Sequence, residues 1–406
     1  MSHQSRVVAL SSRLEQIAAL SETPDGIFRP FASPSAEACV QLVGEWCRDA
    51  HLSMRKDAIG NIRIHDPNRS GAKRKFFMGS HVDTVINAGK YDGVLGFLMA
   101  LDQLEQKRDC PFDLEVVGFS DEEGVRYGTA YLGSSVLVGN FDRDLLSKMD
   151  DLGISMSQAI SDFGGDPCAL DKACFGTENE FEGYLEVHLE QGPVLAASQV
   201  PVGVVTAIAG QFRCTLCFQG KEGHAGTVPM DHRKDAGLGA AEFAMSLERY
   251  ALSRSHEMVA TMGKWTVNPN ASNVIPSEAK VSVDLRSSNE SALSQGIEFI
   301  KHTGTEIAEK RGLAFSLRVD QMNPSVPMSD ELKMRLATAI ASTGQPPIET
   351  RSGAGHDAAI LSHLGPVAML FVRCREGISH SPEEYVSSED IEVAMKVCDH
   401  FFEHYE

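Results

Sequence analysis

The chain has 406 residues, 42% of them hydrophobic and 23% charged, which is the composition of an ordinary folded protein and enough length for about two domains. Its formal net charge is -19 at pH 7, and its sequence pI is about 5.2. Because nucleic acids and anionic membranes attract positive surfaces, this balance argues against both as partners.

The first residues, the apolar runs and the cysteines bear on the cellular location that we expect. Residues 1–20 lack an apolar run behind a basic segment, and no stretch approaches the roughly 20 apolar residues of a membrane span. The nine cysteines are scattered and odd in number, which favours a reducing compartment over a disulfide framework. Cys214 and Cys217 form a CxxC within an alternating run, and no second pair follows at zinc-site spacing. We therefore expect a cytoplasmic protein in which these two cysteines are strand residues.

The first half of the chain alternates helix and strand patterns. The predicted order is helix, helix, strand, strand, helix and strand, over residues 7–20, 36–51, 61–64, 76–80, 93–104 and 114–120. This alternation favours a mostly parallel sheet with helices on both faces, where ligands gather at the carboxyl ends of the strands. Residues 150–180 are rich in glycine and aspartate and weakly periodic, and the sequence assigns them no role.

A second pattern of predicted helices and strands begins near Gly203. The predicted elements are a strand, a helix, two strands, a helix and a strand, over residues 204–219, 233–253, 258–267, 280–286, 289–311 and 314–319. This βαββαβ order is that of a ferredoxin-like α+β domain. We interpret residues 203–320 as a domain inserted into a first domain of residues 1–202 and 321–406. The first domain resumes with a helix over 330–341, a strand over 367–373 and a last helix from Ser388.

Two glycine-rich motifs carry candidate metal ligands. In GSHVDTV, His81 follows the apolar strand, and Asp83 is placed to accept the other ring N–H and so to orient the imidazole. In GKYDGVLG, Asp92 lies in a turn before a helix, where glycines let the backbone pass close to an ion. Taken alone, His81 is more consistent with a structural histidine and Asp92 with a helix N-cap.

Three further motifs also follow predicted strands. In FSDEEGVRYG, the carboxylates of residues 121–123 emerge directly from an apolar strand, where they repel one another unless a cation or a proton offsets their charge. A solvated acidic loop is the alternative. In YLEVHLEQGP, alternation places Glu186 and His188 on the face opposite the apolar residues. In ISHSPEE, His380 lies just past the strand that ends at Arg373.

Together, the five motifs favour a two-metal hydrolase. The candidate ligands are His81, Asp92, Glu123, His188 and His380, a mixed nitrogen and oxygen set that suits Zn²⁺ or Mn²⁺. A carboxylate shared between two ions about 3.5–4 Å apart is typical of two-metal hydrolases. Glu122 is adjacent to a ligand but is not needed as one, so it is the candidate general base.

At these residues the sequence resembles the carboxypeptidase G/aminoacylase superfamily of di-metal hydrolases. It is most similar to the branch of allantoate amidohydrolases, β-ureidopropionases and N-carbamoyl-L-amino-acid hydrolases, and the likeness covers nearly the whole chain. The resemblance implies a catalytic domain with an inserted ferredoxin-like domain that serves dimerisation and closure over the substrate. The branch assignment depends on HLEQGP, because peptidase members usually place a carboxylate where this chain has His188.

The resemblance also implies a role for each motif residue. His81 and His188 hold one ion, Glu123 and His380 hold the other, and Asp92 bridges them, with Glu122 as the base. The substrate-binding residues are implied to be Gln191, His224, Asn273, Arg286, Gly355 (or Gly353) and His356. Among these, His224 polarises the scissile carbonyl, entering the partner subunit's site in a homodimer. Asn273 and Arg286 are implied to bind the substrate's carboxylate. The alternatives are that Asn273 caps a turn and that Arg286 is a surface strand residue.

The implied reaction is hydrolysis of the ureido (carbamoyl) C–N bond of a small carboxylate substrate, with release of ammonia and CO₂. Allantoate, for which we have a slight preference, an N-carbamoyl-L-amino acid, N-carbamoyl-β-alanine and a related ureido acid remain open as substrates. The alternative enzyme is a di-metal peptidase or N-acyl amino acid deacylase of the same superfamily. Outside enzymes, the alternatives are a catalytically silent ligand-binding homologue and a structural dimeric scaffold, although the chain retains Glu122 and every expected ligand.

Overall fold

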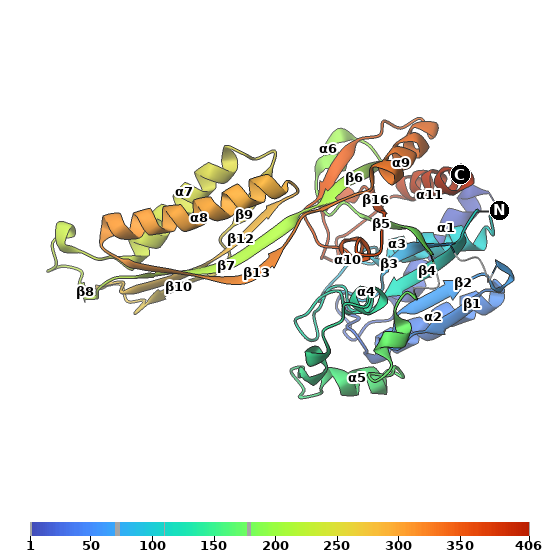
Figure 1. The fold of residues 1–406 in the computed structure, drawn as a ribbon, viewed down its shortest axis with the longest axis horizontal. Helices are drawn as coiled ribbons and strands as arrows, with labels where there is room; N and C mark the ends of the chain where they lie inside the picture. Colours follow the sequence, from blue (N-terminus) through green and yellow to red (C-terminus); the bar gives the residue numbers. More distant parts are fainter. Residues whose placement is uncertain (1, 70–73, 109, 177–179, 406) are drawn as a thin grey trace. The chain divides into compact units, whose positions relative to one another are not determined.

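The computed structural model describes residues 2–69, 74–108, 110–176 and 180–405. The chain divides into two compact units (Figure 1). The first comprises Met1–Thr206, Met328–Thr350 and Gly355–Glu406, and the second comprises Ala207–Pro327 and Arg351–Ala354. Within the described residues, no helix is long and apolar enough to cross a membrane.

The first unit is built on a sheet with the strand order β1-β2-β4-β3-β5-β16-β6-β14, in which β14 is Val326–Pro327, and β15 also pairs with β6. The strands are β1 (Ser53–Lys56), β2 (Ile62–His65), β3 (Arg74–His81), β4 (Asp113–Phe119), β5 (Glu180–Leu189), β6 (Val202–Ile208), β15 (Glu349–Ser352) and β16 (Val367–Val372). Parallel pairing joins β4, β3, β5 and β16, and the pairs β1-β2, β2-β4 and β16-β6 are antiparallel. The mixed α/β class is as expected.

The sheet is less parallel than expected, since three of the pairs named above are antiparallel, and a short connection accounts for one of them, β1-β2. Strand β1, which the sequence analysis misses, ends at Lys56, and β2 begins at Ile62. A connection of this length permits only antiparallel pairing, since a parallel crossover needs a dozen or more residues. The four parallel strands still place their carboxyl ends at one edge of the sheet.

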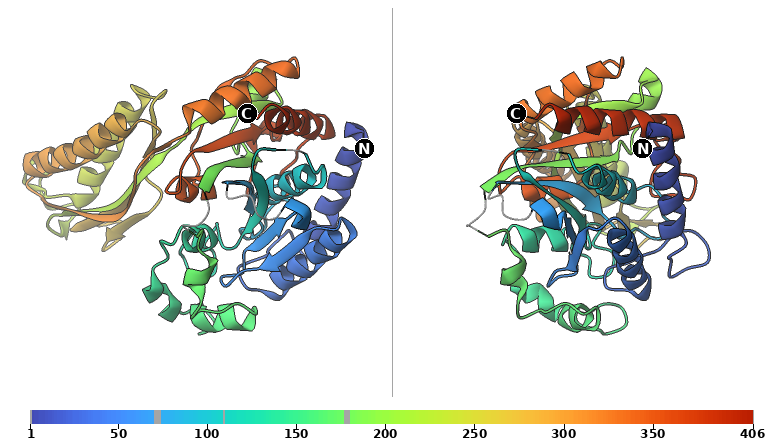
Figure 2. Two further views of the ribbon diagram at one scale, coloured as in Figure 1. Left: turned by 45° about the vertical axis from the view of Figure 1, so that its right-hand side comes forward. Right: turned by 90° about the vertical axis from the view of Figure 1, so that its right-hand side faces the viewer.

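The helices of the first unit lie around this sheet, except for the helix Met156–Asp162, which lies away from it (Figures 1 and 2). They are α1 (His3–Ala18), α2 (Pro34–Asp49), α3 (Val94–Glu105), α4 (Leu132–Leu137), α5 (Met156–Asp162), α6 (Val194–Ser198), α9 (Asp330–Ser342), α10 (Asp357–Leu361) and α11 (Ser388–Glu403). Helices α1, α2, α3, α9 and α11 share one core with strand residues such as Met78 and Val187. Since strand side chains alternate, Glu186 and His188 point to the other face, toward α10.

The weakly periodic segment 150–180 is folded where the structure describes it. Its helix α5 contributes Met156 and Ile160 to a small apolar cluster that also contains Phe31, Tyr127 and Val136. The local sequence does not reveal this packing because the partners lie up to 129 residues away in the chain, as from Phe31 to Ile160. The segment therefore packs beside the loops that follow β4.

The second unit is an antiparallel sheet with two helices on it. The strand order is β10-β12-β7-β13, and β9 pairs with the end of β12. Its elements are β7 (Gly210–Gln219), β8 (Gly223–His224), α7 (Ala236–Leu252), β9 (Met258–Thr261), β10 (Trp265–Asn268), β11 (Val274–Ile275), β12 (Glu278–Ser287), α8 (Glu290–Arg311), β13 (Ala314–Asn323) and β14 (Val326–Pro327). Both cysteines of the CxxC lie on β7, with Cys214 fully buried and Cys217 bonded to Glu278.

Two strands that the sequence predicts as continuous are each divided in the structure. The predicted strand 204–219 becomes β6 and β7, because the Ala209 N–H leaves the ladder and donates to the Ser352 carbonyl oxygen at 2.8 Å. The predicted strand 258–267 becomes β9 and β10, which are separated by three residues including Gly263. The element order of the ferredoxin-like pattern is otherwise present.

Candidate metal centre

The carboxyl ends of the parallel strands bring the candidate ligands to one place. His81 is the last residue of β3 and pairs in register with Phe119, the last residue of β4, so residues 121–123 begin beside it. His188 is one residue from the end of β5, opposite Phe371 of β16. His380 follows β16 by one loop. The topology therefore assembles residues from four distant segments.

Asp92 lies at the middle of the assembled side chains. Its Oδ1 atom is 3.3 Å from His188 Nε2, and its Oδ2 atom is 3.1 Å from His380 Nε2. His380 Nε2 is also 3.4 Å from Glu123 Oε1, and His188 Nε2 is 3.4 Å from His81 Nε2. One carboxylate oxygen thus faces the pair of histidines, while the other faces the group of His380 and Glu123.

Backbone carbonyls fix the orientation of both buried histidines. His81 Nδ1 lies 2.9 Å from the Asp83 carbonyl oxygen, and His188 Nδ1 lies 3.0 Å from the Leu189 carbonyl oxygen. A carbonyl only accepts, so each neutral ring carries its proton on Nδ1 and presents an Nε2 lone pair to the other ring and to Asp92. Lone pairs and carboxylate oxygens that converge in this way repel one another unless a cation lies among them.

The donor set fits divalent cations. Ligand atoms of His81, Asp92 and His188 lie within 4.8 Å of one another, and so do those of Asp92, Glu123 and His380. Imidazole nitrogens and carboxylate oxygens suit Zn²⁺ or Mn²⁺. The residues present could therefore hold metal, and Asp92 belongs to both groups. A third group within the same limit joins His81 to Glu122 and Glu123.

The expected contact between the His81 ring and the Asp83 carboxylate is replaced by another. The carbonyl of Asp83 bonds the ring, and the nearest carboxylate oxygen is 3.8 Å from Nδ1. The carboxylate instead accepts the backbone N–H groups of Glu122 and Glu123, both at 3.1 Å. Asp83 therefore positions the turn that carries the candidate base and ligand, in addition to the His81 ring.

The helix-cap alternative for Asp92 is wrong. Helix α3 has Gly93 as its N-cap residue, and the Asp92 carboxylate faces the histidines. Gly93 has φ +66°, and a Cβ atom there would lie 2.5 Å from the His81 ring. Only glycine satisfies both conditions, so the glycine of GKYDG lets the turn approach the His81 ring.

The charges of the site shift its pKa values. Burial alone would lower the pKa of His81, but Asp83, Asp92 and Glu123 outweigh it and raise that pKa to about 9. Hydrogen bonds to Asp92 and Glu123 raise the pKa of His380 to about 10. Burial would raise the pKa of Asp92, yet the nearby histidines lower it. Asp92 is thus an anion that strongly attracts positive charge.

Glu122 has the properties of a proton acceptor that can also donate. Its side chain is buried, and burial together with the charges of Glu123 and Asp357 raises its pKa well above the ordinary value. General bases and acids work best when their pKa lies near the working pH, and a bound cation would lower that of Glu122 again. The backbone N–H bond to Asp83 fixes its position.

Strained backbone is concentrated here. Asp121, Tyr131, Gln191 and His380 have φ of +56°, +63°, +54° and +54°, values that non-glycine residues seldom adopt. Such conformations persist where surrounding contacts enforce them, and they are frequent at functional sites. Both carboxylate oxygens of Asp121 are buried, and the described residues offer them no hydrogen-bond partner.

The substrate-binding residues predicted in the first unit lie at the cluster. Gln191 Nε2 is 3.2 Å from Asp92 Oδ1 and 3.3 Å from His380 Nε2, so this amide touches the candidate ligands themselves. The His356 ring is buried with its centroid 4.5 Å from that of His188, and burial lowers its pKa well below the ordinary value. His356 is therefore a neutral ring. A Cβ on Gly355 would lie 1.7 Å from the Tyr131 hydroxyl oxygen.

The remaining predicted residues lie in the second unit. His224 pairs with Val274 across β8 and β11, and the Ala225 N–H donates to the Asn273 carbonyl at 3.0 Å, so His224 and Asn273 are close. Arg286 lies on β12, and its Nε and Nη2 atoms donate to Asp284, both at 3.0 Å. Its Nη1 atom donates to the Gly353 carbonyl at 2.7 Å. The guanidinium is therefore oriented by its own strand.

Several residues of the site escape the sequence analysis. Tyr131 lies beside Gly355, while Ser379 and Glu384 contact the Asp92 turn. Glu186 accepts bonds from Ser80 and from the Ala358 N–H at the start of α10. The only sequence signal for Glu384 is its place in ISHSPEE, where two adjacent glutamates give no means of choosing between them.

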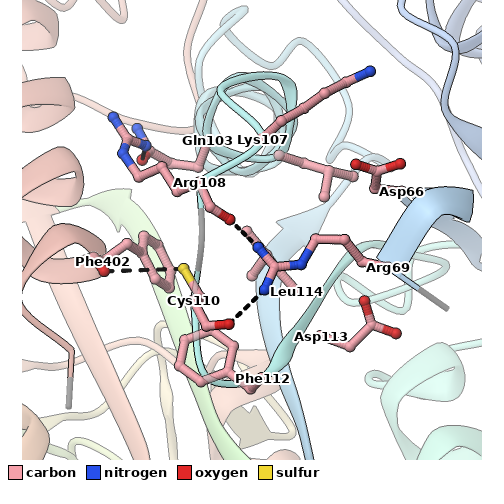
Figure 3. A pocket seen from close by; sticks show the side chains of 11 residues that line it. Asp66, Arg69, Gln103, Lys107, Arg108, Cys110, Phe112, Asp113, Leu114 and Phe402 are labelled. Atoms are coloured by element: carbon pink, nitrogen blue, oxygen red, sulfur yellow. Dashed lines mark hydrogen bonds between the residues drawn. The ribbon is translucent and has the colours of Figure 1, made fainter. Parts of the chain in front are cut away.

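A separate pocket lies elsewhere in the first unit (Figure 3). It is lined by residues that include Arg69, Arg108, Cys110 and Phe402. The Arg69 guanidinium donates to the carbonyls of Arg108 and Cys110, and Arg108 donates to Asp399. These charged groups bond neighbouring segments to one another, so the residues that line the pocket have a structural role.

Comparison with known proteins identifies the family of the chain. Residues 77–404 match peptidase family M20/M25/M40. The chain is 36% identical to allantoate deiminase of Arabidopsis thaliana, over 94% of this chain and 79% of that protein. It is 32% identical to an N-carbamoyl-L-amino-acid amidohydrolase of Pseudomonas sp., over 96% and 95%. The crystal structure of a hydantoinase/carbamoylase family amidase from Burkholderia multivorans matches with a TM-score of 0.89 and 30% identity, covering 98% of this chain and 97% of that one. Because the family match covers most of its sequence, the chain belongs to peptidase family M20/M25/M40.

Proposed function

We propose that this protein is a two-metal hydrolase that cleaves the ureido C–N bond of a small carboxylate substrate, allantoate or an N-carbamoyl-L-amino acid. The observation that carries the proposal is the position of Asp92, whose two oxygens face two different groups of ligands, beside the buried Glu122. The names of the relatives support the same class, a hydrolase of C–N bonds other than peptide bonds. Allantoate deiminase and N-carbamoyl-amino-acid amidohydrolase both act on ureido compounds.

The two groups of side chains assign the proposed ligands. His81 and His188 would hold one ion, Glu123 and His380 the other, and Asp92 both. Zn²⁺ or Mn²⁺ bound there would act as a Lewis acid on the substrate carbonyl and make water easier to deprotonate. Gln191 contacts Asp92 and His380 and would keep these ligands oriented.

The chain's own residues would move the proton. Glu122 would take a proton from the attacking water and pass it to the departing nitrogen of the ureido group. The carbamate that leaves would break down to ammonia and CO₂, and the rest of the substrate would leave as an amine. His224 would stabilise the negative charge that develops on the carbonyl oxygen.

Recognition of the carboxylate falls to the second unit. Arg286 presents a guanidinium held by Asp284, and a planar guanidinium can bind a carboxylate at two points. Asn273, next to His224, would donate a further hydrogen bond. Residues 203–320, the proposed inserted domain, would serve dimerisation and closure over the substrate. The homodimer and the cytoplasmic location stay predictions of the sequence.

A turnover screen tests the proposal. Metal-free protein is loaded with Zn²⁺ or Mn²⁺ and incubated with allantoate, N-carbamoyl-L-amino acids and N-carbamoyl-β-alanine, and ammonia release is measured. N-acetyl-L-amino acids and dipeptides serve as comparison substrates, with amine release as the readout. We expect ammonia from at least one ureido compound and no amine from the comparison substrates. Turnover confined to N-acetyl compounds or dipeptides would replace the proposal with a deacylase or a peptidase.

A further inference from the structure

Glu384 is a buried carboxylate next to the candidate metal centre. It lies four residues after His380, and its residue is 5% exposed. A buried carboxylate is costly unless hydrogen bonds satisfy its oxygens. Both oxygens are satisfied here, and each one bonds a different loop.

The two oxygens of Glu384 join two loops that are far apart in the sequence. Oε1 accepts the backbone N–H groups of Tyr91 at 2.8 Å and Asp92 at 3.0 Å. Oε2 accepts the Ser379 hydroxyl at 2.8 Å. One loop carries Asp92, which belongs to both groups of candidate ligands, and the other carries His380, which belongs to one group. The Glu384 side chain therefore connects Asp92 to His380.

Ser379 reinforces this link. Its hydroxyl oxygen lies 3.4 Å from Asp92 Oδ2, the same oxygen that faces His380. Two contacts limit the movement of Asp92: its backbone N–H donates to Glu384 Oε1 at 3.0 Å, and its Oδ2 atom faces the Ser379 hydroxyl, whose single proton can be donated either to Glu384 or to Asp92. Glu384 and Ser379 therefore limit the position of Asp92 Oδ2, the oxygen that faces His380.

The Asp92 turn is shaped to fit over Glu384. A Cβ atom on Gly89 would lie 2.4 Å from Glu384 Cβ and 2.5 Å from its Oε1. Any side chain at residue 89 would push Glu384 away from the N–H groups that it accepts. The glycine at the start of GKYDG is thus explained by Glu384, as Gly93 is explained by His81.

We propose that Glu384 is a positioning residue that holds Asp92 and His380 in the geometry of the second metal group, so that tight binding of that ion depends on it. The inference rests on the proposed function, because it takes Asp92, Glu123 and His380 as the ligands. Glu384 would touch neither substrate nor ion. Its effect would pass through the two loops that it joins.

The test is a metal titration of metal-free protein for Glu384→Ala, with Glu383→Gln as the matched control. Glu383 is the adjacent glutamate of the same motif and is exposed, so its neutralisation removes an equal charge and leaves the bonds between the two loops in place. Loss of residues that orient metal ligands typically costs 10- to 100-fold in metal affinity. We expect Glu384→Ala to lose about 10-fold or more for one of two ions, while Glu383→Gln titrates like the parent protein. Equal titration of Glu384→Ala and the parent would overturn the inference.

A conservative replacement separates positioning from charge. In Glu384→Gln the amide oxygen can still accept both backbone N–H groups, and the amide nitrogen can donate to Ser379. We expect this variant to recover most of the affinity that Glu384→Ala loses. Recovery no better than that of alanine would show that the negative charge matters and not the connection, and it would overturn the positioning role.

Gly89→Ala provides a second route if Glu384→Ala folds poorly. It keeps every charge and displaces Glu384 by contact alone, so the same loss at one ion is expected. Circular dichroism and the thermal midpoint of the metal-free variants report folding separately from binding. If the parent protein bound no pair of ions, the proposed function itself would fail. If the parent bound two ions and both variants bound them equally well, only the role of Glu384 would fail.

Discussion

The Nε2 atoms of His81 and His188 lie 3.4 Å apart, and a backbone carbonyl bonds the Nδ1 atom of each ring. Two lone pairs at this distance need a proton or a cation between them. In metal-free protein a proton serves, which is consistent with the raised pKa of His81, about 9. In metal-loaded protein the cation would take its place.

The first prediction concerns pH. The folded-state pKa values of His81 and His380, about 9 and about 10, lie above the ordinary value of 6.5. These protons therefore stabilise the metal-free fold fully below about pH 6.5, and that stabilisation is lost as the pH rises through 9 to 10. Metal must displace the protons, so metal affinity should rise over the same range. Thermal midpoints of metal-free and metal-loaded protein should diverge from pH 7 to 9, and a constant difference would contradict the assignment.

The second prediction separates two adjacent glutamates. Glu122→Gln should lower kcat by about 10²- to 10⁴-fold, because it removes a group that accepts and donates protons, while the metal content stays at that of the parent. Glu123→Gln should instead lower the content or affinity of one ion. Elemental analysis and steady-state kinetics on both variants provide the comparison. Near-parental turnover of fully loaded Glu122→Gln would refute the base assignment.

The third prediction concerns carboxylate recognition. Arg286→Ala should raise KM by about 10- to 100-fold with little change in kcat, the loss expected for a charge-assisted hydrogen bond. Arg318 is the matched control, since it lies on β13 of the same sheet and pairs at 2.8 Å with Asp320, two residues along its strand. Arg318→Ala should leave KM unchanged. A lower kcat at constant KM in Arg286→Ala would contradict a role in binding.

The fourth prediction concerns stability. Arg6 of α1 is 4% exposed and bonds Asp102 of α3 and Asp399 of α11. Arg6→Ala leaves two carboxylates without this partner and should lower the free energy of unfolding by about 3–5 kcal/mol. Arg13→Ala breaks a more exposed pair with Glu105 on the same two helices, α1 and α3, and should cost about 0.2–1 kcal/mol. Denaturant titrations of both variants measure the difference, and equal losses would refute the argument.

The sequence predicts most helices and strands of this protein because their apolar periodicity is strong. Helix α2 shows why, since its buried residues Cys39, Val40, Val43 and Cys47 recur three or four positions apart, as on one face of a helix. The divided strands β6/β7 and β9/β10 are not predictable in this way, because a ladder breaks when a backbone N–H finds a partner distant in sequence, as Ala209 finds Ser352. The antiparallel pairing of β1 with β2 follows from their short connection, but that of β2 with β4 brings together strands that are far apart in the sequence.

Each ligand motif is ambiguous when taken alone, and the metal site is predictable because five such motifs occur in one chain. His81, Asp92 and His188 occur in distinctive glycine-rich or alternating segments, and the structure brings their ligand atoms within 4.8 Å. Residues whose role depends on contacts between motifs are not visible in one sequence. Glu384 and Asp83 act through backbone N–H groups of other loops, and no local pattern records such a bond. The pairing of Arg286 with Asp284 is local in the sequence, but no local pattern indicates the proposed role of Arg286 in binding the substrate.

Anomalous diffraction from crystals of active protein loaded with Zn²⁺ or Mn²⁺ is the most direct test of a shared centre. We expect two peaks in each subunit, one among His81, Asp92 and His188 and the other among Asp92, Glu123 and His380. Glu122 should lie beside the peaks without coordinating either. Fully active protein with a single peak, or with peaks away from Asp92, would contradict the two-metal centre.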